Sequence, residues 1–266
     1  MTDLELLREY AERRSEEAFA SLVSRYSGLV YSVAVRRLQN AQIAEEVTQA
    51  VFLLLARKAR RVSAQTVLSG WLFQTARFLS ADMFKSEVRR KAREQQAARM
   101  DLNQESAGSE ALESLTPLVD DSIGKLKPTE RDAILLRFFE RKNYPEVGEV
   151  LGISEEAARK RVDRAIDKMR GFLAESGAAV SGVALSGALE IHLAQSAPQA
   201  LAAAVTKAVV SVPAVTLTQA ILHMITSIQL KTAVVGGAIL AVVATALVES
   251  SNRRPPWTRR RSNQPK

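Results

Sequence analysis

The 266-residue sequence contains no cysteine and only two histidines. The lack of cysteine excludes disulfide bridges, thiolate zinc sites and cysteine nucleophiles, and it is typical of proteins of a reducing cytoplasm. Both histidines, His192 and His223, lie in an apolar segment without a metal-ligand partner nearby in the sequence. We therefore expect no metal site and no cofactor.

Motifs for catalysis are also missing. The sequence has neither a glycine-rich phosphate loop nor a nucleophile elbow. The paired acids Glu45–Glu46 and Asp120–Asp121 are consecutive, so on a helix their side chains point in different directions and cannot form an acid–base dyad. We expect a protein that is not an enzyme.

Aromatic residues make up only 5% of the chain, whereas alanine, leucine, arginine and glutamate are common, which favours helices over strands. An apolar content of 47% is too high for a disordered protein. Apolar residues at three-and-four spacing predict helices in residues 4–60, and Gly70 precedes a further helix that becomes polar and basic from Lys85 to Arg99. The charged amino terminus has no features of a secretory signal. These patterns predict an all-α fold.

A net charge of +8 invites a nucleic-acid interpretation, but most of this excess lies in the last seventeen residues, 250–266, which hold six basic side chains and no acid. Overall basicity is therefore weak support for DNA binding, and local clusters have to carry that case.

A helix-turn-helix is predicted in residues 144–173. A short helix from Tyr144 to Leu151 leads to Gly152, which permits a left-handed turn, and Ser154 is placed to cap a second helix. The buried stripe of that helix is expected to hold Ala158, Val162, Ala165, Ile166 and Met169. Its outer face is expected to hold Glu155, Glu156, Arg159, Lys160, Asp163 and Arg164. Such a helix fits the DNA major groove, but periodicity alone slightly favours an ordinary helical hairpin with a solvated charged face.

Three stretches carry a resemblance to a known family. One stretch closely resembles the promoter-reading domain of the extracytoplasmic-function sigma factors of bacterial RNA polymerase: LLRFFERKNYPEVGEVLGISEEAARKRVDRAIDKMR. The core-binding helix of that family resembles AEEVTQAVFLLLARK, residues 44–58, and its helix for melting the minus-10 element resembles SGWLFQTARFLSADMFKSEVRRK, residues 69–91. The three matches stand in the family's order within residues 10–173.

The resemblance implies a domain organisation and a function. Residues 1–95 would form region 2, a helical bundle for core binding and minus-10 recognition; 96–117, rich in Ser, Gly and acids, a flexible linker; and 118–175 region 4, a helix-turn-helix domain for the minus-35 element. The implied partners are the RNA polymerase core enzyme and promoter DNA. Such a factor performs no covalent chemistry; it holds the polymerase, recognises the promoter and assists melting.

The same resemblance implies site residues. Core polymerase would be met by Glu45, Glu46, Gln49 and Phe52, although the helical spacing allows Phe52 to lie in the domain core instead. The minus-10 element would be met by Phe73, Arg77, Phe78, Lys85, Arg89 and Arg90. Each aromatic taken alone fits a core position as well, and Phe78 stands where many family members have a polar residue. The minus-35 element would be met by Glu156, Arg159, Lys160, Arg161 and Arg164.

The chain continues past the family's usual end as a helical, apolar extension. Residues 176–230 are alanine-rich, 231–249 predict a transmembrane helix, and 250–266 form a basic tail. A buried globular helix is the alternative for 231–249. One span would export the basic tail against the positive-inside tendency, so a second pass within 208–230 or a location at the membrane surface stays open.

The extension predicts a cytoplasmic protein attached to the inner membrane, in which the extension takes the place of a separate anti-sigma partner. Two other functions compete with the sigma-factor interpretation. A helix-turn-helix regulator that acts without polymerase has no use for a core-binding helix, and a membrane scaffold with an incidental hairpin would bind no DNA.

Overall fold

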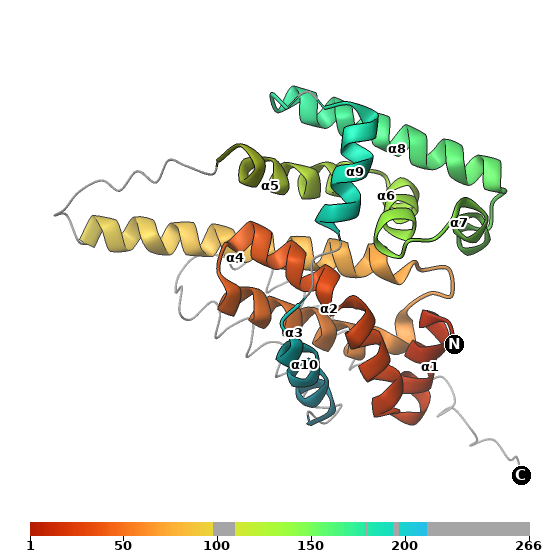
Figure 1. Ribbon diagram of the computed structural model, residues 1–266. Coiled ribbons are helices and arrows are strands. Elements are labelled where there is room, and N and C mark those ends of the chain that lie inside the picture. The colour runs from red at the N-terminus through yellow and green to blue at the C-terminus, as the bar shows by residue number, and fades with distance from the viewer. Residues whose placement is uncertain (98–109, 179, 194–196, 212–266) are drawn as a thin grey trace, which may run out of the picture.

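The computed structural model describes residues 1–97, 110–178, 180–193 and 197–211, and all regular secondary structure in this part is helical (Figure 1). This confirms the predicted all-α fold.

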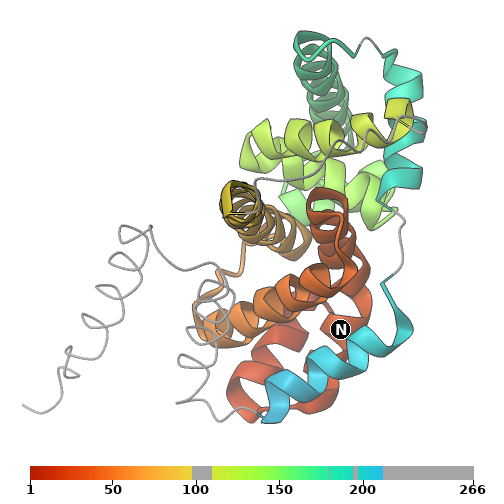
Figure 2. The same ribbon diagram turned by 90° about the vertical axis from the view of Figure 1, so that its left-hand side faces the viewer.

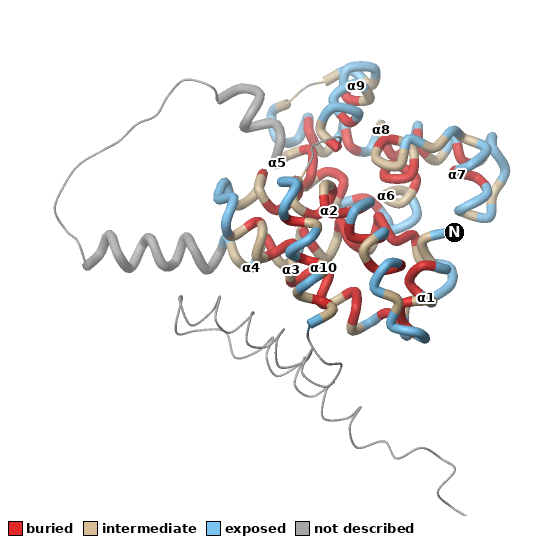
Figure 3. The backbone as a smooth tube through the Cα atoms, turned by 60° about the horizontal axis from the view of Figure 1, so that its bottom comes forward, coloured by how far each residue is buried: buried red, intermediate tan, exposed pale blue. Residues whose placement is uncertain are grey.

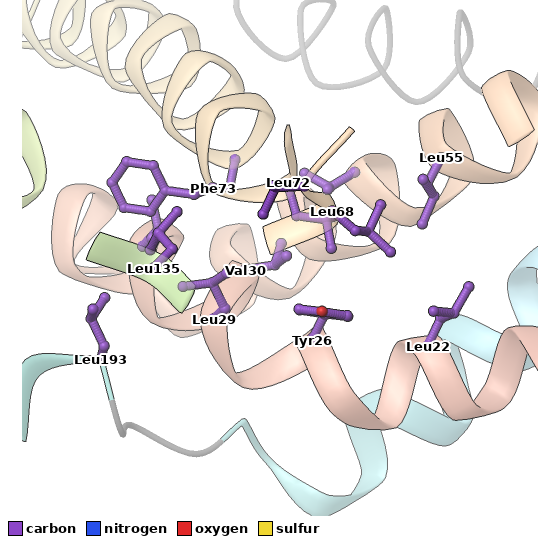
Figure 4. Close-up of a cluster of buried hydrophobic side chains, with 14 of the residues drawn as sticks. Leu22, Tyr26, Leu29, Val30, Leu55, Leu68, Leu72, Phe73, Leu135 and Leu193 are labelled. Carbon is purple, nitrogen blue, oxygen red and sulfur yellow. The ribbon is translucent and has the colours of Figure 1, made fainter. Parts of the chain in front are cut away.

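The amino-terminal bundle consists of α1 (Asp3–Arg13), α2 (Glu16–Leu38), α3 (Ala41–Lys58), the short η1 (Ala59–Arg61) and α4 (Leu68–Ala97). Thr2, Ser15 and Asn40 cap the first three helices, because each accepts a hydrogen bond from a backbone amide of the first turn. Helix α2 lies at the centre, in contact with α1, α3 and α4. Its large apolar side chains form the middle of the core (Figure 4).

The second module consists of α5 (Glu110–Lys125), α6 (Pro128–Ile134), the π-helical turn η2 (Leu135–Phe139), α7 (Tyr144–Leu151) and α8 (Glu155–Glu175). Pro128 opens α6 as predicted, because a proline at the first helical position lacks only an amide that would be unpaired anyway. The predicted linker is longer than the gap between helices: α4 runs to Ala97 and α5 already begins at Glu110. Helix α5 thus begins inside the acidic, Ser-rich stretch that is predicted as linker.

The extension forms two further helices, α9 (Gly182–His192) and α10 (Gln199–Ser211). Helix α9 packs on α8 of the second module, and α10 packs on α2 and α3 of the amino-terminal bundle (Figure 2). Apolar side chains of both helices, and Leu193 directly after α9, are buried within the same core as both modules: Leu185, Leu189, Leu193, Leu201, Val205 and Val209. Figure 3 colours the backbone of both helices by burial.

Within the described residues, α2 is long and apolar enough to cross a membrane, yet most of it is buried as the central helix of the core. The predicted membrane helix, 231–249, and the basic tail, 250–266, lie outside the described residues, as does 212–230 of the alanine-rich extension.

Candidate nucleic-acid interface

Helices α7 and α8 form the predicted helix-turn-helix. Asn143 caps α7 through a reciprocal pair of hydrogen bonds with Glu146, 2.9 and 2.8 Å long. Gly152 ends α7 in the left-handed conformation, with φ of 64°, and Ser154 caps α8 by accepting a hydrogen bond of 3.2 Å from the amide of Ala157. The sequence prediction of turn and cap is confirmed.

The two faces of α8 are also as predicted, with Ile166 as the one partly exposed member of the inner stripe. Ala158, Val162, Ala165 and Met169 are fully buried. Four of the proposed DNA-facing side chains are exposed: Glu156, Arg159, Lys160 and Arg164. The fifth, Arg161, is half-buried beside the inner stripe. The mixed charge on this face leaves a few cations to contact DNA while the acids limit attraction to phosphate.

Two basic residues of the α8 face, Arg159 and Lys160, are held by neighbours. The Arg159 guanidinium lies 5.0 Å from the ring centre of Tyr144 and pairs with Glu155 at 3.5 Å. Lys160 Nζ lies 2.6 Å from Glu156 one turn earlier. By contrast, no acid of the described part of the chain pairs with Arg164. The Tyr144 ring and Glu155 therefore hold Arg159 in place, whereas Arg164 is exposed.

The aromatic side chains of α4 divide into core and surface. Phe73 is fully buried and lies beside Leu135 of η2, so its ring cannot stack on a base (Figure 4). This corrects the prediction that Phe73 contacts the minus-10 element. Phe78 and Phe84 are 62% and 45% exposed. Such exposure is unusual for phenylalanine and leaves both rings open to a partner.

Arg77 of α4 is less accessible than the sequence suggests. Arg77 is half-buried and donates hydrogen bonds of 3.3 and 3.1 Å from Nε and Nη2 to Oδ1 of Asp121 in α5. Arg37 of α2 donates to the same oxygen at 2.9 Å. Lys85, Arg89 and Arg90 lie along α4, at positions whose side chains fall outside the description.

Helix α3 carries the predicted polymerase contacts. Glu45, Glu46 and Gln49 are half-exposed on its surface. Phe52 is fully buried and meets Phe19 of α2 edge-to-face, with ring centres 6.4 Å apart. The ring belongs to the core, the alternative that the helical spacing allowed, and it is not available to anchor a partner.

Sequence reasoning missed a buried charge network between the modules. Arg36 of α2 donates from Nε and Nη2 to the two carboxylate oxygens of Asp120 in α5, both at 2.9 Å. His192 of α9 lies 2.9 Å from Asp120 Oδ1 through Nε2. Burial raises the pKa of Asp120, but the hydrogen bonds from His192 and Arg36 outweigh it, so the pKa lies below its ordinary value.

No local pattern announces this network, because the partners of Asp120 are 84 and 72 residues away along the chain. The consecutive acids do point apart as predicted: Asp120 faces Arg36 inside, while Asp121 faces Arg77 near the surface. Among the described residues, no group of three or more acids or histidines is arranged to hold a metal ion.

Comparison with known proteins agrees with this architecture. Residues 22–90 match the family model for Sigma-70 region 2, and residues 122–171 match the model for Sigma-70, region 4. The first match spans most of α2, all of α3 and most of α4, and the second includes the helix-turn-helix.

The curated relatives are similar over the same part of the chain. The RNA polymerase sigma factor CarQ of Myxococcus xanthus is 29% identical over 163 residues, 60% of this chain and 92% of the relative. The ECF RNA polymerase sigma factor BldN of Streptomyces coelicolor is 30% identical over 167 residues, 60% of this chain and 62% of the relative. The ECF RNA polymerase sigma factor SigW of Bacillus subtilis is 24% identical over 178 residues, 60% of this chain and 90% of the relative.

The two sigma family models match in the family's order, one on the amino-terminal bundle and one on the helix-turn-helix module. The relatives are themselves RNA polymerase sigma factors. The chain belongs to the extracytoplasmic-function RNA polymerase sigma factor family.

Proposed function

We propose that this sigma factor directs promoter-specific initiation by holding core polymerase through α3, contacting the minus-10 element through α4 and reading the minus-35 element through α8. The proposed boundaries are residues 1–95 for region 2 and 118–175 for region 4. The observation that carries the proposal is the capped helix α8, which presents a charged face to solvent directly after a helix-turn-helix bend.

At the minus-35 element, α8 would enter the major groove with its first turns at the base edges. Arg159, held against the Tyr144 ring, and Arg164, which pairs with no acid among the described residues, are the side chains suited to bidentate contact with guanine. Lys160 is placed to contact phosphate. Arg161 is half-buried at the edge of this face, and Glu156 is paired with Lys160. Both would contact the DNA next to the two arginines.

At the minus-10 element, the exposed ring of Phe78 offers a platform for an unstacked base, worth about 1–3 kcal/mol per base. Phe84 offers a second ring, 45% exposed, six positions further along α4. Arg77 contributes a cation once it leaves Asp121, and Lys85, Arg89 and Arg90 continue the basic character along the helix. The buried Phe73 would support this surface from behind and make no DNA contact.

For core polymerase, the half-exposed Glu45, Glu46 and Gln49 are the side chains on α3 that a basic or polar partner surface would meet. Phe52 would keep α3 in place by packing on Phe19. The apolar segment 231–249 would attach the factor to the inner membrane, with the sigma domains in the cytoplasm, and the extension would replace a separate anti-sigma protein.

Run-off transcription with purified core polymerase on a promoter library tests the proposal. A sigma factor yields discrete transcripts only when chain and core are both present. A regulator that acts without polymerase would instead protect specific DNA alone and add no initiation activity to core. Fractionation of cells expressing the full chain and a chain ending at residue 230 tests the membrane attachment, which predicts loss from the membrane fraction in the shorter chain.

A further inference from the structure

We propose that helices α9 and α10 are an intramolecular clasp, which holds the two sigma regions in a closed arrangement that must open before the factor can occupy a promoter. The proposal rests on the proposed function, since it concerns the same polymerase-facing and DNA-facing helices. Three features carry it: the contacts that close the regions on each other, the spacing of the two DNA-reading helices, and the position of α10.

Ion pairs join the two sigma regions: one pair is buried, and one acid is shared by two arginines. The Arg36–Asp120 pair joins α2 to α5 with both side chains about 95% buried, and His192 of α9 completes the same site. A second acid, Asp121, holds Arg37 and Arg77 from the amino-terminal bundle. Part of the closed interface is thus built from Arg77, a cation proposed for the minus-10 element.

The regions fit together tightly, because a charged side chain of one region lies directly against a glycine of the other at two places. A Cβ built at Gly70 of α4 would overlap the carboxylate of Asp132 in α6, and one built at Gly124 of α5 would overlap the guanidinium of Arg77. Glycine at each position is what allows the neighbouring charged side chain to lie against the helix. Both contacts join one sigma region to the other.

In the closed arrangement the two DNA-reading helices, α4 and α8, lie too close together to reach both promoter elements. Helix α6 contacts both α4 and α8, so the two DNA-reading helices are separated by two helix-to-helix spacings, about 20 Å in all. The minus-10 and minus-35 elements are about 25 base pairs apart, which is roughly 85 Å of B-DNA. The sigma regions must therefore separate before α4 and α8 can reach their elements on one DNA duplex.

The extension limits that separation. Between α4 and α5 the chain has twelve residues, which reach about 45 Å when extended, but between α9 and α10 it has six, which reach about 24 Å. Because α9 is packed on α8 and α10 on α2 and α3, this shorter connection holds the regions together as long as both helices stay docked. The buried Leu189, Leu193 and Val205 stabilise the docked state.

Helix α10 also lies along α2 and along α3, the helix proposed to meet polymerase. Its first residue, Gln199, lines a cavity with Gly28 of α2, and its later residue Ala203 lines a groove with Ala20, so α10 runs antiparallel to α2. On α3, with which α10 is also in contact, Gln49 shares a helical stripe with Leu53 and Ala56, whose side chains are already buried. A helix docked here reduces the part of α3 that a large partner can approach.

A crosslink between α10 and α2 tests the clasp in the full-length chain. The sequence has no cysteine, so Ala20→Cys with Ala203→Cys provides the two thiols of the chain, on opposite walls of one groove. A short bismaleimide joins them, and each single-cysteine chain treated in the same way is the control. The readouts are binding to core polymerase and run-off transcription.

The clasp predicts that the crosslinked chain loses roughly tenfold or more of both activities relative to the controls, because α10 can no longer leave α2 and α3, and opening then depends on α9 alone leaving α8. Equal activity of crosslinked and control chains would overturn the clasp, and so would failure of the two thiols to crosslink. If the control chains and a His192→Ala chain, which lacks one member of the buried network, all fail to direct transcription, the proposed function itself fails, and the two outcomes are thereby distinguished.

Discussion

The guanidinium of Arg77 in α4 is bound to the carboxylate of Asp121 in α5, with Nη2 3.1 Å from Oδ1. A side chain that family resemblance assigns to the minus-10 element is thus held by the other sigma region. If α4 binds the minus-10 element as proposed, DNA binding and closure of the two regions compete for the same cation.

Asp121→Asn is expected to weaken this competition. The carboxylate is about one-third exposed, so each of its ion pairs contributes about 1 kcal/mol or less. We predict an increase of a few-fold in affinity for single-stranded minus-10 DNA, measured by fluorescence anisotropy, with affinity for minus-35 duplex unchanged. Asp167→Asn, which removes an exposed acid paired with Arg170 on α8, is the matched control. A gain of the same size in both variants would indicate a general charge effect.

Asp120→Ala is expected to be far more destabilising than Asp121→Ala. It leaves the buried Arg36 without its carboxylate, a loss of about 3–5 kcal/mol for a pair of this kind, whereas the exposed neighbour contributes much less. Urea denaturation of the two variants at neutral pH measures the difference, and equal midpoints would contradict the assignment. Because the pKa of Asp120 is lowered, the stability from this site is present above the ordinary carboxyl pKa of 3.8 and is lost as the pH falls through the folded-state pKa.

Asp132 should have the opposite pH dependence. Burial raises the pKa of its carboxyl to about 6, and the charge of Arg131 offsets only part of this shift. Between the ordinary value of 3.8 and about 6 the folded chain binds a proton that the unfolded chain has released, so this site loses stability as the pH rises. Asp132→Asn should therefore raise the thermal midpoint at about pH 7 and leave it unchanged below about pH 4. A lower midpoint at neutral pH would show that the carboxylate is stabilising.

Arg164→Ala and Arg159→Ala are expected to reduce discrimination at the minus-35 element by about 1–3 kcal/mol each, without a change in core binding. Competition binding with single-base variants of the element measures the effect. Tyr144→Leu should reproduce part of the Arg159 effect, because it removes the ring that orients that guanidinium, and should not alter the contact made by Arg164. Footprints unchanged at the minus-35 element in both arginine variants would contradict the proposed roles.

Phe78→Ala is expected to slow promoter melting, because it removes a stacking surface worth about 1–3 kcal/mol. Permanganate reactivity of unpaired thymines in the initiation complex reports melting directly. Val183→Ala, which shortens an exposed apolar side chain on α9, is a control for the loss of surface hydrophobicity. If melting is equally fast in Phe78→Ala and wild type, the ring does not contact an unpaired base.

Local sequence patterns predicted the helix-turn-helix of α7 and α8 well. The turn at Gly152, the cap at Ser154 and the buried stripe of α8 depend on interactions within a few residues, which spacing and residue type report directly. The same reasoning could not decide between core and surface for Phe52 and Phe73, because a helical stripe shows which residues share a face but not which partner covers that face.

Contacts between distant parts of the chain were beyond prediction. Arg36, Asp120 and His192 come from three helices, and nothing near any one of them indicates the other two. The extension was predicted to be helical and apolar, but its docking on α2 and α3 depends on the shape of a surface formed by those helices together. Its predicted membrane helix and basic tail, residues 231–266, lie outside the described residues.

In the proposed function, this chain confers promoter specificity on core polymerase. Run-off transcription on a promoter library, with chain alone, core alone and both together, tests it most directly. We predict discrete transcripts only from the combined reaction, and their loss when Arg159 and Arg164 are both replaced by alanine. Transcripts that do not depend on the chain, or sequence-specific DNA binding by the chain that adds no initiation in the presence of core, would contradict it.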